Sequence, residues 1–235
     1  MPKATKYKHL FFDLDHTLWD FESNSRLILQ ELYQRYELKN RGVQDFDEFN
    51  RHYINYNEIL WEKYRNGLMK VEELRWKRMW LTLLEFKIAD EDLSREMGIV
   101  FLERLPTRNI LFPHTREILD YLTRKKYHLH LITNGFEKTQ QSKLQNAHLE
   151  NYFETVITSE ASNSLKPHKE IFDYAIMKTK AQREESIMLG DSIEVDILGA
   201  LNAGIDQVYV NHTGIEPQIR PTYIVHSLKE LENIF

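Results

Sequence analysis

Cysteine is absent from this sequence, and its absence excludes several kinds of site at once. Without a thiol there is no disulfide framework, no cysteine nucleophile and no zinc site built on cysteine. Glycine is also sparse, with 8 residues in 235, and no low-complexity linker divides the chain. HExxH metal motifs, glycine-rich Walker or dinucleotide fingerprints and the G-x-S-x-G nucleophile elbow are missing too.

Long apolar runs and an excess of basic charge are missing as well. No stretch approaches the roughly 18–20 apolar residues of a membrane span. The beginning of the chain, MPKATKYKHLFFD, does not read as a signal peptide. The 31 basic and 36 acidic residues give a net charge of −5, which argues against a general nucleic-acid binder. We therefore expect a cytoplasmic protein that engages neither membranes nor nucleic acids.

What is present divides into a helical stretch and an alternation of strands and helices. The alternation predicts an α/β core with a parallel, Rossmann-like sheet. Its expected strands are His9–Phe12, His128–Thr133, Thr155–Thr158, Ile187–Leu189, Gln207–Val210 and Tyr223–Val225. Its expected helices are Thr115–Lys125, Glu137–Asn146, Lys169–Lys178 and Asp196–Ala203.

Residues 20–109 read instead as successive amphipathic helices, with apolar residues at steps of three and four. Ser23 and Ser25 are candidate N-caps for the first of them. The strand at 9–12 has no α/β partner nearby, so it must join the later sheet. We therefore expect a discontinuous core of residues 1–19 and 110–235, with an all-helical domain of residues 20–109 inserted after the first strand.

Chemically capable side chains follow four of the expected strands. They are Asp13, Asp15 and Thr17 after the first, Thr133 and Asn134 at the end of the second, Lys166 a few residues beyond the third, and Asp191 and Asp196 after the fourth. In an open parallel sheet, ligands bind beyond the carboxyl ends of the strands. Taken singly, each group also fits a turn or a helix cap. Their conjunction, each at a strand end, favours a site.

Four carboxylates converging on one edge would repel one another unless a cation lies among them. Oxygen-only ligands suit a hard ion, and Mg²⁺ fits best. Such an ion commonly also holds a phosphate. Thr133, the amide of Asn134 and Lys166 supply donors and one positive charge for it. The residues therefore predict phosphoryl transfer.

In this order, the four motifs resemble those of the haloacid dehalogenase superfamily of phosphohydrolases, across nearly the whole chain. The inserted helices are similar to that family's α-helical cap. Four stretches resemble bacterial pyrimidine 5′-nucleotidases of the superfamily: LWEKYRNG, ITNGFEKTQQSKL, KPHKEIFDYAI and GDSIEVDILGALNAGI. The resemblance implies hydrolysis of nucleoside monophosphates.

The resemblance also implies a role for each motif residue. Asp13 is the nucleophile that becomes an aspartyl phosphate, and Asp15 is the general acid and base. Lys166 offsets the negative charge of Asp13 and the phosphate. The phosphate oxygens are held by Thr133, Asn134 and Lys166, and Mg²⁺ by Asp13, the carbonyl of Asp15, Asp191 and Asp196.

Two positions separate reactions within the superfamily. Dehalogenases of the family lack an acid at the position of Asp15, because a halide leaves without a proton, so Asp15 points to phosphate esters. Thr17 resembles the phosphatases more than the mutases. Relatives often carry glycine where this chain has Asn163. Because asparagine tolerates left-handed backbone angles, we expect that loop to be kept.

Several alternatives stay open at this stage. The substrate of the same reaction could be a sugar phosphate or phosphoglycolate, or the chain could be a non-catalytic binding protein on the same fold. In the helical segment, Trp61, Tyr64, Trp76 and Trp80 either pack its core or stack on a base. The oligomeric state, monomer or homodimer, is also open.

Overall fold

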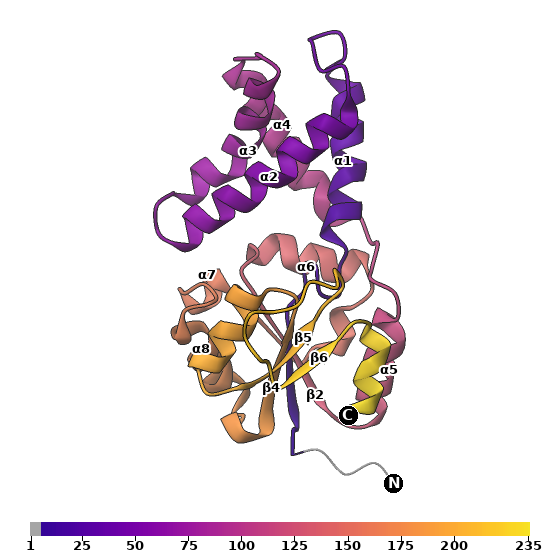
Figure 1. The fold of residues 1–235 in the computed structure, drawn as a ribbon, viewed down its shortest axis with the longest axis vertical. Helices are drawn as coiled ribbons and strands as arrows, with labels where there is room; N and C mark the ends of the chain where they lie inside the picture. Colours follow the sequence, from indigo (N-terminus) through magenta and orange to yellow (C-terminus); the bar gives the residue numbers. More distant parts are fainter. Residues whose placement is uncertain (1–5) are drawn as a thin grey trace. The chain divides into compact units, whose positions relative to one another are not determined.

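A six-stranded sheet forms the centre of the larger unit of the chain. The computed structural model describes residues 6–235 (Figure 1). Every neighbouring pair of strands is parallel, in the order β3-β2-β1-β4-β5-β6. The strands are β1 (His9–Phe12), β2 (His128–Thr133), β3 (Thr155–Thr158), β4 (Ser186–Gly190), β5 (Asp206–Val210) and β6 (Tyr223–Val225). All six predicted strands are confirmed, with β4 one residue longer at each end and β5 beginning one residue earlier.

Helices cover the sheet because its strands are apolar on both faces. Phe11 pairs in register with Met188, and both lie in a core cluster with Ile132 and Phe172 of α8. Leu10 and Phe12 alternate with Phe11 and are also fully buried, so the opposite face is covered too. The helices of this unit are α5 (Thr115–Arg124), α6 (Glu137–Asn146), α7 (Ser159–Ser162), α8 (Lys169–Thr179) and α9 (Leu198–Asn202).

Short helical turns complete the unit. They are the 3₁₀ segments Glu150–Tyr152, Arg183–Glu185 and Leu228–Asn233 and the π-turn Ile193–Ile197, which leads directly into α9. The helix that we expected to begin at Asp196 begins earlier, at Ile193, with this π-turn. Ser192 caps its start, because the Ser192 hydroxyl accepts a hydrogen bond from the Val195 N–H. The last 3₁₀ segment lies beside α5 (Figure 1).

The chain divides into two compact units, residues 1–20 with 109–235, and residues 21–108. The second unit holds α1 (Phe21–Arg35), α2 (Phe46–Arg65), α3 (Val71–Glu85), α4 (Glu91–Arg104) and the 3₁₀ segment Leu105–Thr107. Its core includes Phe49, Tyr53 and Phe101, all buried. Among residues 6–235, no helix combines the length and the apolar character needed to cross a membrane.

Two local expectations for the helical unit need correction or refinement. Ser23 and Ser25 are not N-caps, because α1 already begins at Phe21 and Ser25 instead donates to the carbonyl of Glu22. The four aromatic residues contact one another in pairs along their helices, with centroids 5.7 Å apart for Trp61–Tyr64 and 6.2 Å for Trp76–Trp80. All four are only half-buried, so they lie at the edge of the helical core.

A stacked group of histidines lies at the beginning of β1 and β2. His130 is buried, its Nε2 lies 3.1 Å from Nδ1 of His9, and His9 stacks on His128 at 4.8 Å between centroids. Burial lowers the pKa of His130 to about 4, with the charge of His9 adding and that of Glu154 opposing. His130 is therefore neutral in the folded protein at neutral pH.

The fold is expected to lose stability on acidification through His130. Because its pKa is lower in the folded than in the unfolded chain, the stability it permits is complete above about pH 6.5 and is lost as pH falls toward about 4. At pH 5 the loss amounts to about 2 kcal/mol. Urea unfolding at pH 8 and pH 5 measures it: His130→Phe should reduce the pH difference by about this amount. The exposed control His226→Phe should keep the wild-type difference between the two pH values. An equal difference in the wild type and both variants would contradict the assignment.

Candidate functional site

Asp13 directly follows the carboxyl end of β1 and lies in a buried polar site. Leu10, Phe11 and Phe12 are fully buried, and the Asp13 N–H continues the sheet by donating to the Leu189 carbonyl at 2.8 Å. Asp13 is itself only 7% exposed. β1 and β4 are central neighbours, and the order of the sheet reverses between them, which is where open α/β sheets bind ligands.

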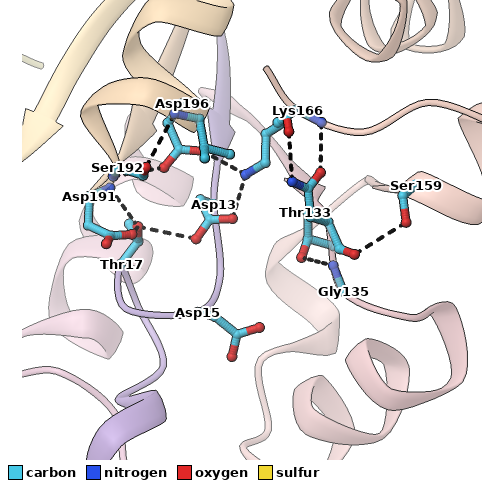
Figure 2. Close-up of polar contacts among 12 residues, drawn as sticks. Asp13, Asp15, Thr17, Thr133, Gly135, Ser159, Lys166, Asp191, Ser192 and Asp196 are labelled. Atoms are coloured by element: carbon cyan, nitrogen blue, oxygen red, sulfur yellow. Dashed lines mark hydrogen bonds and ion pairs between the residues drawn. The ribbon is translucent and has the colours of Figure 1, made fainter. Parts of the chain in front are cut away.

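A buried lysine lies between two carboxylates of this site. Lys166 Nζ is 2.6 Å from Asp13 Oδ1 and 2.7 Å from Asp196 Oδ1 (Figure 2). Burial opposes the charge of Lys166, but the attraction of Asp13 and Asp196 outweighs it and raises the pKa of the lysine. Lys166 is therefore a fixed positive charge next to the predicted nucleophile.

The side chain of Asn134 holds the backbone of Lys166. The side-chain Nδ2 of Asn134 donates to the Lys166 carbonyl at 2.9 Å, and the Lys166 N–H donates to Asn134 Oδ1 at 2.7 Å. The side-chain amide of Asn134 thus clamps two loops together. Asn163, just before Lys166, adopts the left-handed backbone (φ 51°) that we expected it to tolerate, so this expectation is confirmed.

Thr133 ends β2 with its hydroxyl already accepting two hydrogen bonds. The Gly135 N–H donates to Thr133 Oγ1 at 3.1 Å, and Gln140 Nε2 donates to it at 2.6 Å. A hydroxyl has two acceptor positions and one hydrogen. The hydrogen of Thr133 is therefore left to donate to an anion.

Three carboxylates form an acidic cluster. One oxygen each of Asp13, Asp191 and Asp196 lies within 4.8 Å of the other two. Thr17 Oγ1 links two of them, at 3.0 Å from Asp191 Oδ1 and 3.4 Å from Asp13 Oδ2 (Figure 2). The site needs glycine at position 190, because a Cβ there would lie 2.3 Å from Asp196 Oδ2.

The electrostatics of this cluster disfavour its own negative charge. Burial raises the pKa of Asp13 to about 8; Lys166 opposes the shift, and Asp196 and Asp191 add to it. Burial and Asp196 likewise raise the pKa of Asp191 to about 7. A divalent cation would relieve this repulsion, so the acidic cluster can hold a metal ion.

Asp15 lies apart from the Asp13 cluster (Figure 2). Its carboxylate is bound instead by two residues of α6, Lys143 Nζ at 2.5 Å from Oδ1 and Gln140 Nε2 at 2.9 Å from Oδ2. Burial opposes the charge of Asp15, but Lys143 and Gln140 outweigh it and lower the pKa of that carboxyl. Hydrogen bonds join the other predicted site residues around Asp13 and Lys166, whereas Asp15 and Thr133 share Gln140 beside them.

Sequence reasoning missed Gln140 and Lys143. A weak signal was available in the period of α6, because both share its inward face with Leu144, and all three are buried. A buried glutamine and lysine on such a face need polar partners. In a segment as polar as EKTQQSKLQN, however, the same residues read as solvated.

Comparison with known proteins agrees with this geometry. Residues 7–204 match the model of the family described as haloacid dehalogenase-like hydrolase. The chain is similar to pyrimidine 5′-nucleotidase YjjG of Escherichia coli, with 33% identity over 97% of this chain and 98% of that protein. It is 30% identical to pyrimidine 5′-nucleotidase PynA of Streptococcus pneumoniae, over 96% of this chain and 93% of that protein.

Among solved structures, the fold is similar to that of the putative HAD-hydrolase YfnB of Bacillus subtilis bound to magnesium. The TM-score is 0.87 at 26% identity, over 98% of this chain and 99% of that one. The match of fold, motif order and near full-length sequence leads to one conclusion. The chain belongs to the haloacid dehalogenase-like hydrolases and is an enzyme of the phosphoric monoester hydrolase type.

Proposed function

We propose that the chain is a Mg²⁺-dependent 5′-nucleotidase that favours pyrimidine nucleoside monophosphates such as dUMP and dTMP. The observation that carries the choice of substrate is the likeness, over 97% and 96% of the chain, to two bacterial pyrimidine 5′-nucleotidases. The charge arrangement around Asp13 supports the reaction type, because a buried carboxylate beside a fixed lysine suits attack on a phosphoryl group.

The acidic cluster fits Mg²⁺. It offers carboxylate oxygens alone, which suit a hard cation, and the relative YfnB has been solved with magnesium bound. We assign the ion to the carboxylates of Asp13 and Asp191 and the carbonyl of Asp15. Asp196 already accepts from Lys166 Nζ at Oδ1 and from the Ser192 N–H at Oδ2, so it supports the ion chiefly through its charge. When bound, Mg²⁺ supplies charge neutralisation for the phosphoryl group.

The protein residues then divide the reaction between them. One oxygen of Asp13 attacks phosphorus, and the bond from phosphorus to the 5′ oxygen breaks. Lys143 and Gln140 favour the ionised form of Asp15, so Asp15 first takes up a proton from solvent and then gives it to the departing alkoxide. In the second half a water attacks the same phosphorus and loses its proton to Asp15, which frees Asp13 and inorganic phosphate. Thr133 donates its hydroxyl hydrogen to a phosphoryl oxygen, and Lys166 balances the negative charge of Asp13 and the substrate throughout.

A substrate panel tests this proposal. Phosphate release is measured with dUMP, dTMP, UMP, AMP, a sugar phosphate and phosphoglycolate, after chelation and again after Mg²⁺ is restored. We expect release only with Mg²⁺, with kcat/KM for the pyrimidine deoxynucleotides at least about tenfold above the non-nucleotide esters, a difference of about 1.4 kcal/mol in transition-state binding. Fastest release from the sugar phosphate or phosphoglycolate would overturn the substrate. Equal release by the chelated protein would overturn the metal dependence.

A further inference from the structure

The inward face of α6 carries two buried polar side chains that lie outside the four motifs. Gln140 and Lys143 are three residues apart, on the same side of the helix, and are 0% and 3% exposed. A buried ammonium group is costly unless it is paired. Lys143 is paired with Asp15 at 2.5 Å, and its Nζ also lies 4.4 Å from the ring centre of Trp19. The lysine is thus aimed at the predicted proton-transfer group.

Gln140 links the same group to the phosphate side of the site. Its Nε2 donates one hydrogen to Asp15 Oδ2 at 2.9 Å and the other to Thr133 Oγ1 at 2.6 Å. An ionised carboxylate only accepts hydrogen bonds, so the nitrogen and not the oxygen of the Gln140 amide must face it. Both oxygens of Asp15 are therefore held from a single helix.

The turn between β2 and α6 is shaped around this glutamine. A Cβ at position 135 would lie 2.4 Å from Cδ and Nε2 of Gln140, so only glycine leaves the side chain its place. The same Gly135 donates its N–H to Thr133. Thr133, Gly135 and Gln140 thus form one unit, in which the glutamine occupies the second acceptor position of the threonine and leaves the hydroxyl hydrogen for the phosphate.

We propose that Gln140 and Lys143 are positioning residues, which fix the Asp15 carboxylate by both oxygens and orient the Thr133 hydroxyl toward the phosphoryl group. The inference rests on the proposed function in one respect, that Asp15 takes up a proton and transfers it to the leaving group. It does not depend on which phosphate ester is the natural substrate.

Two aryl phosphates separate positioning from a merely structural role. p-Nitrophenolate is a weak base and leaves readily without a proton. Phenolate is a stronger base, and its departure depends far more on proton transfer. kcat/KM reports the first irreversible step, in which the leaving group departs. Mispositioning of Asp15 must therefore lower kcat/KM for phenyl phosphate more than for p-nitrophenyl phosphate. A general loss of structure lowers both values by the same factor.

The experiment compares Lys143→Met and Gln140→Leu with Asp15→Asn as the reference, each with Mg²⁺ present. We expect Asp15→Asn and Lys143→Met to lower kcat/KM for phenyl phosphate on the order of 10²-fold, and that for p-nitrophenyl phosphate by less than about tenfold. Lys143→Arg should recover part of the loss, because its cation still reaches the carboxylate. The matched controls Lys138→Met and Gln141→Leu, both exposed on α6, should leave the ratio of the two substrates unchanged.

Gln140→Leu should lower kcat/KM for both substrates, because it also releases Thr133. The loss should be larger for phenyl phosphate. A cycle with Thr133→Val then reports that coupling, since the second substitution should add little to the first. Equal losses on both aryl phosphates in Lys143→Met, or no loss, would overturn the positioning role. If Lys143→Met does not fold, Gln140→Leu and Lys143→Arg carry the same comparison.

Failure of the proposed function looks different from failure of this inference. A wild-type enzyme that prefers sugar phosphates over nucleotides ends the nucleotidase proposal and leaves the aryl phosphate ratios intact. If Asp15→Asn shows no dependence on the leaving group, the proton-transfer role of Asp15 is wrong. If Asp15→Asn depends on the leaving group and Lys143→Met does not, the positioning inference alone is wrong.

Discussion

Replacement of Asp13 by asparagine is expected to lower turnover by at least about 10⁴-fold, as for other residues that act as the nucleophile. The amide keeps the shape of the side chain but cannot form the phosphoryl ester. The fold should survive, because burial and the neighbouring carboxylates raise the pKa of Asp13 to about 8 and so disfavour its charged form. Lys166 also keeps its second partner, Asp196, at 2.7 Å. Steady-state phosphate release and urea unfolding measure the two effects.

The Asp13 prediction has a clear control and a clear contradiction. Asp173→Asn removes an exposed carboxylate of α8 that pairs with Lys169 and Arg183, and it should leave turnover unchanged. Asp13→Ala guards against regeneration of aspartate by deamidation of the asparagine. Turnover within about tenfold of the wild type in both Asp13 variants would place the nucleophile elsewhere.

Replacement of Lys166 by methionine is expected to damage both activity and stability. Loss of one preorganised charge at the reacting centre typically costs about 10²–10³ in kcat. Removing the shared partner of two buried carboxylates, Asp13 and Asp196, leaves them uncompensated, and breaking a buried pair in this way costs about 3–5 kcal/mol. Urea unfolding and turnover of the same preparation test the two losses together.

A second substitution distinguishes the two roles of Lys166. Adding Asp196→Asn to Lys166→Met removes one of the stranded charges, so the double variant should regain part of the stability and none of the turnover. Lys169→Met, which breaks an exposed pair with Asp173, should change the free energy of unfolding by no more than about 0.5 kcal/mol. A Lys166→Met protein as stable as this control would show that the buried pairing contributes nothing to the fold.

Much of the core could be predicted because its signals are local. The segment His9–Phe12 is a short apolar run ended abruptly by Asp13, and β2 ends in the same way at Thr133. Parallel strands place such ends on one edge of the sheet, so motif residues far apart in sequence could be placed together. The left-handed Asn163 was predictable for a similar reason, since few side chains tolerate that backbone.

The contacts of Asp15 could not be predicted, because they depend on which side of α6 meets the loop after β1. Gln140 and Lys143 share their face of α6 with a single apolar residue, Leu144, which is too weak a period to separate them from the exposed Gln141 and Lys138. The double engagement of Asp196 by Lys166 and Ser192 likewise depends on how the loop that carries Lys166 meets the π-turn that carries Ser192 and Asp196. The family resemblance implied a metal-binding role for Asp196, which stays a prediction.

The central claim, that a phosphoryl group passes through Asp13, is tested most directly by trapping the intermediate. Asp15→Asn removes the proposed base of the second step, so the aspartyl phosphate should accumulate with p-nitrophenyl phosphate and Mg²⁺. After acid quench, borohydride converts an acyl phosphate to the alcohol, and peptide mass spectrometry locates it. We predict homoserine at position 13, present with Mg²⁺ and absent after chelation. A phosphoryl group on any other side chain of the chain would contradict the account.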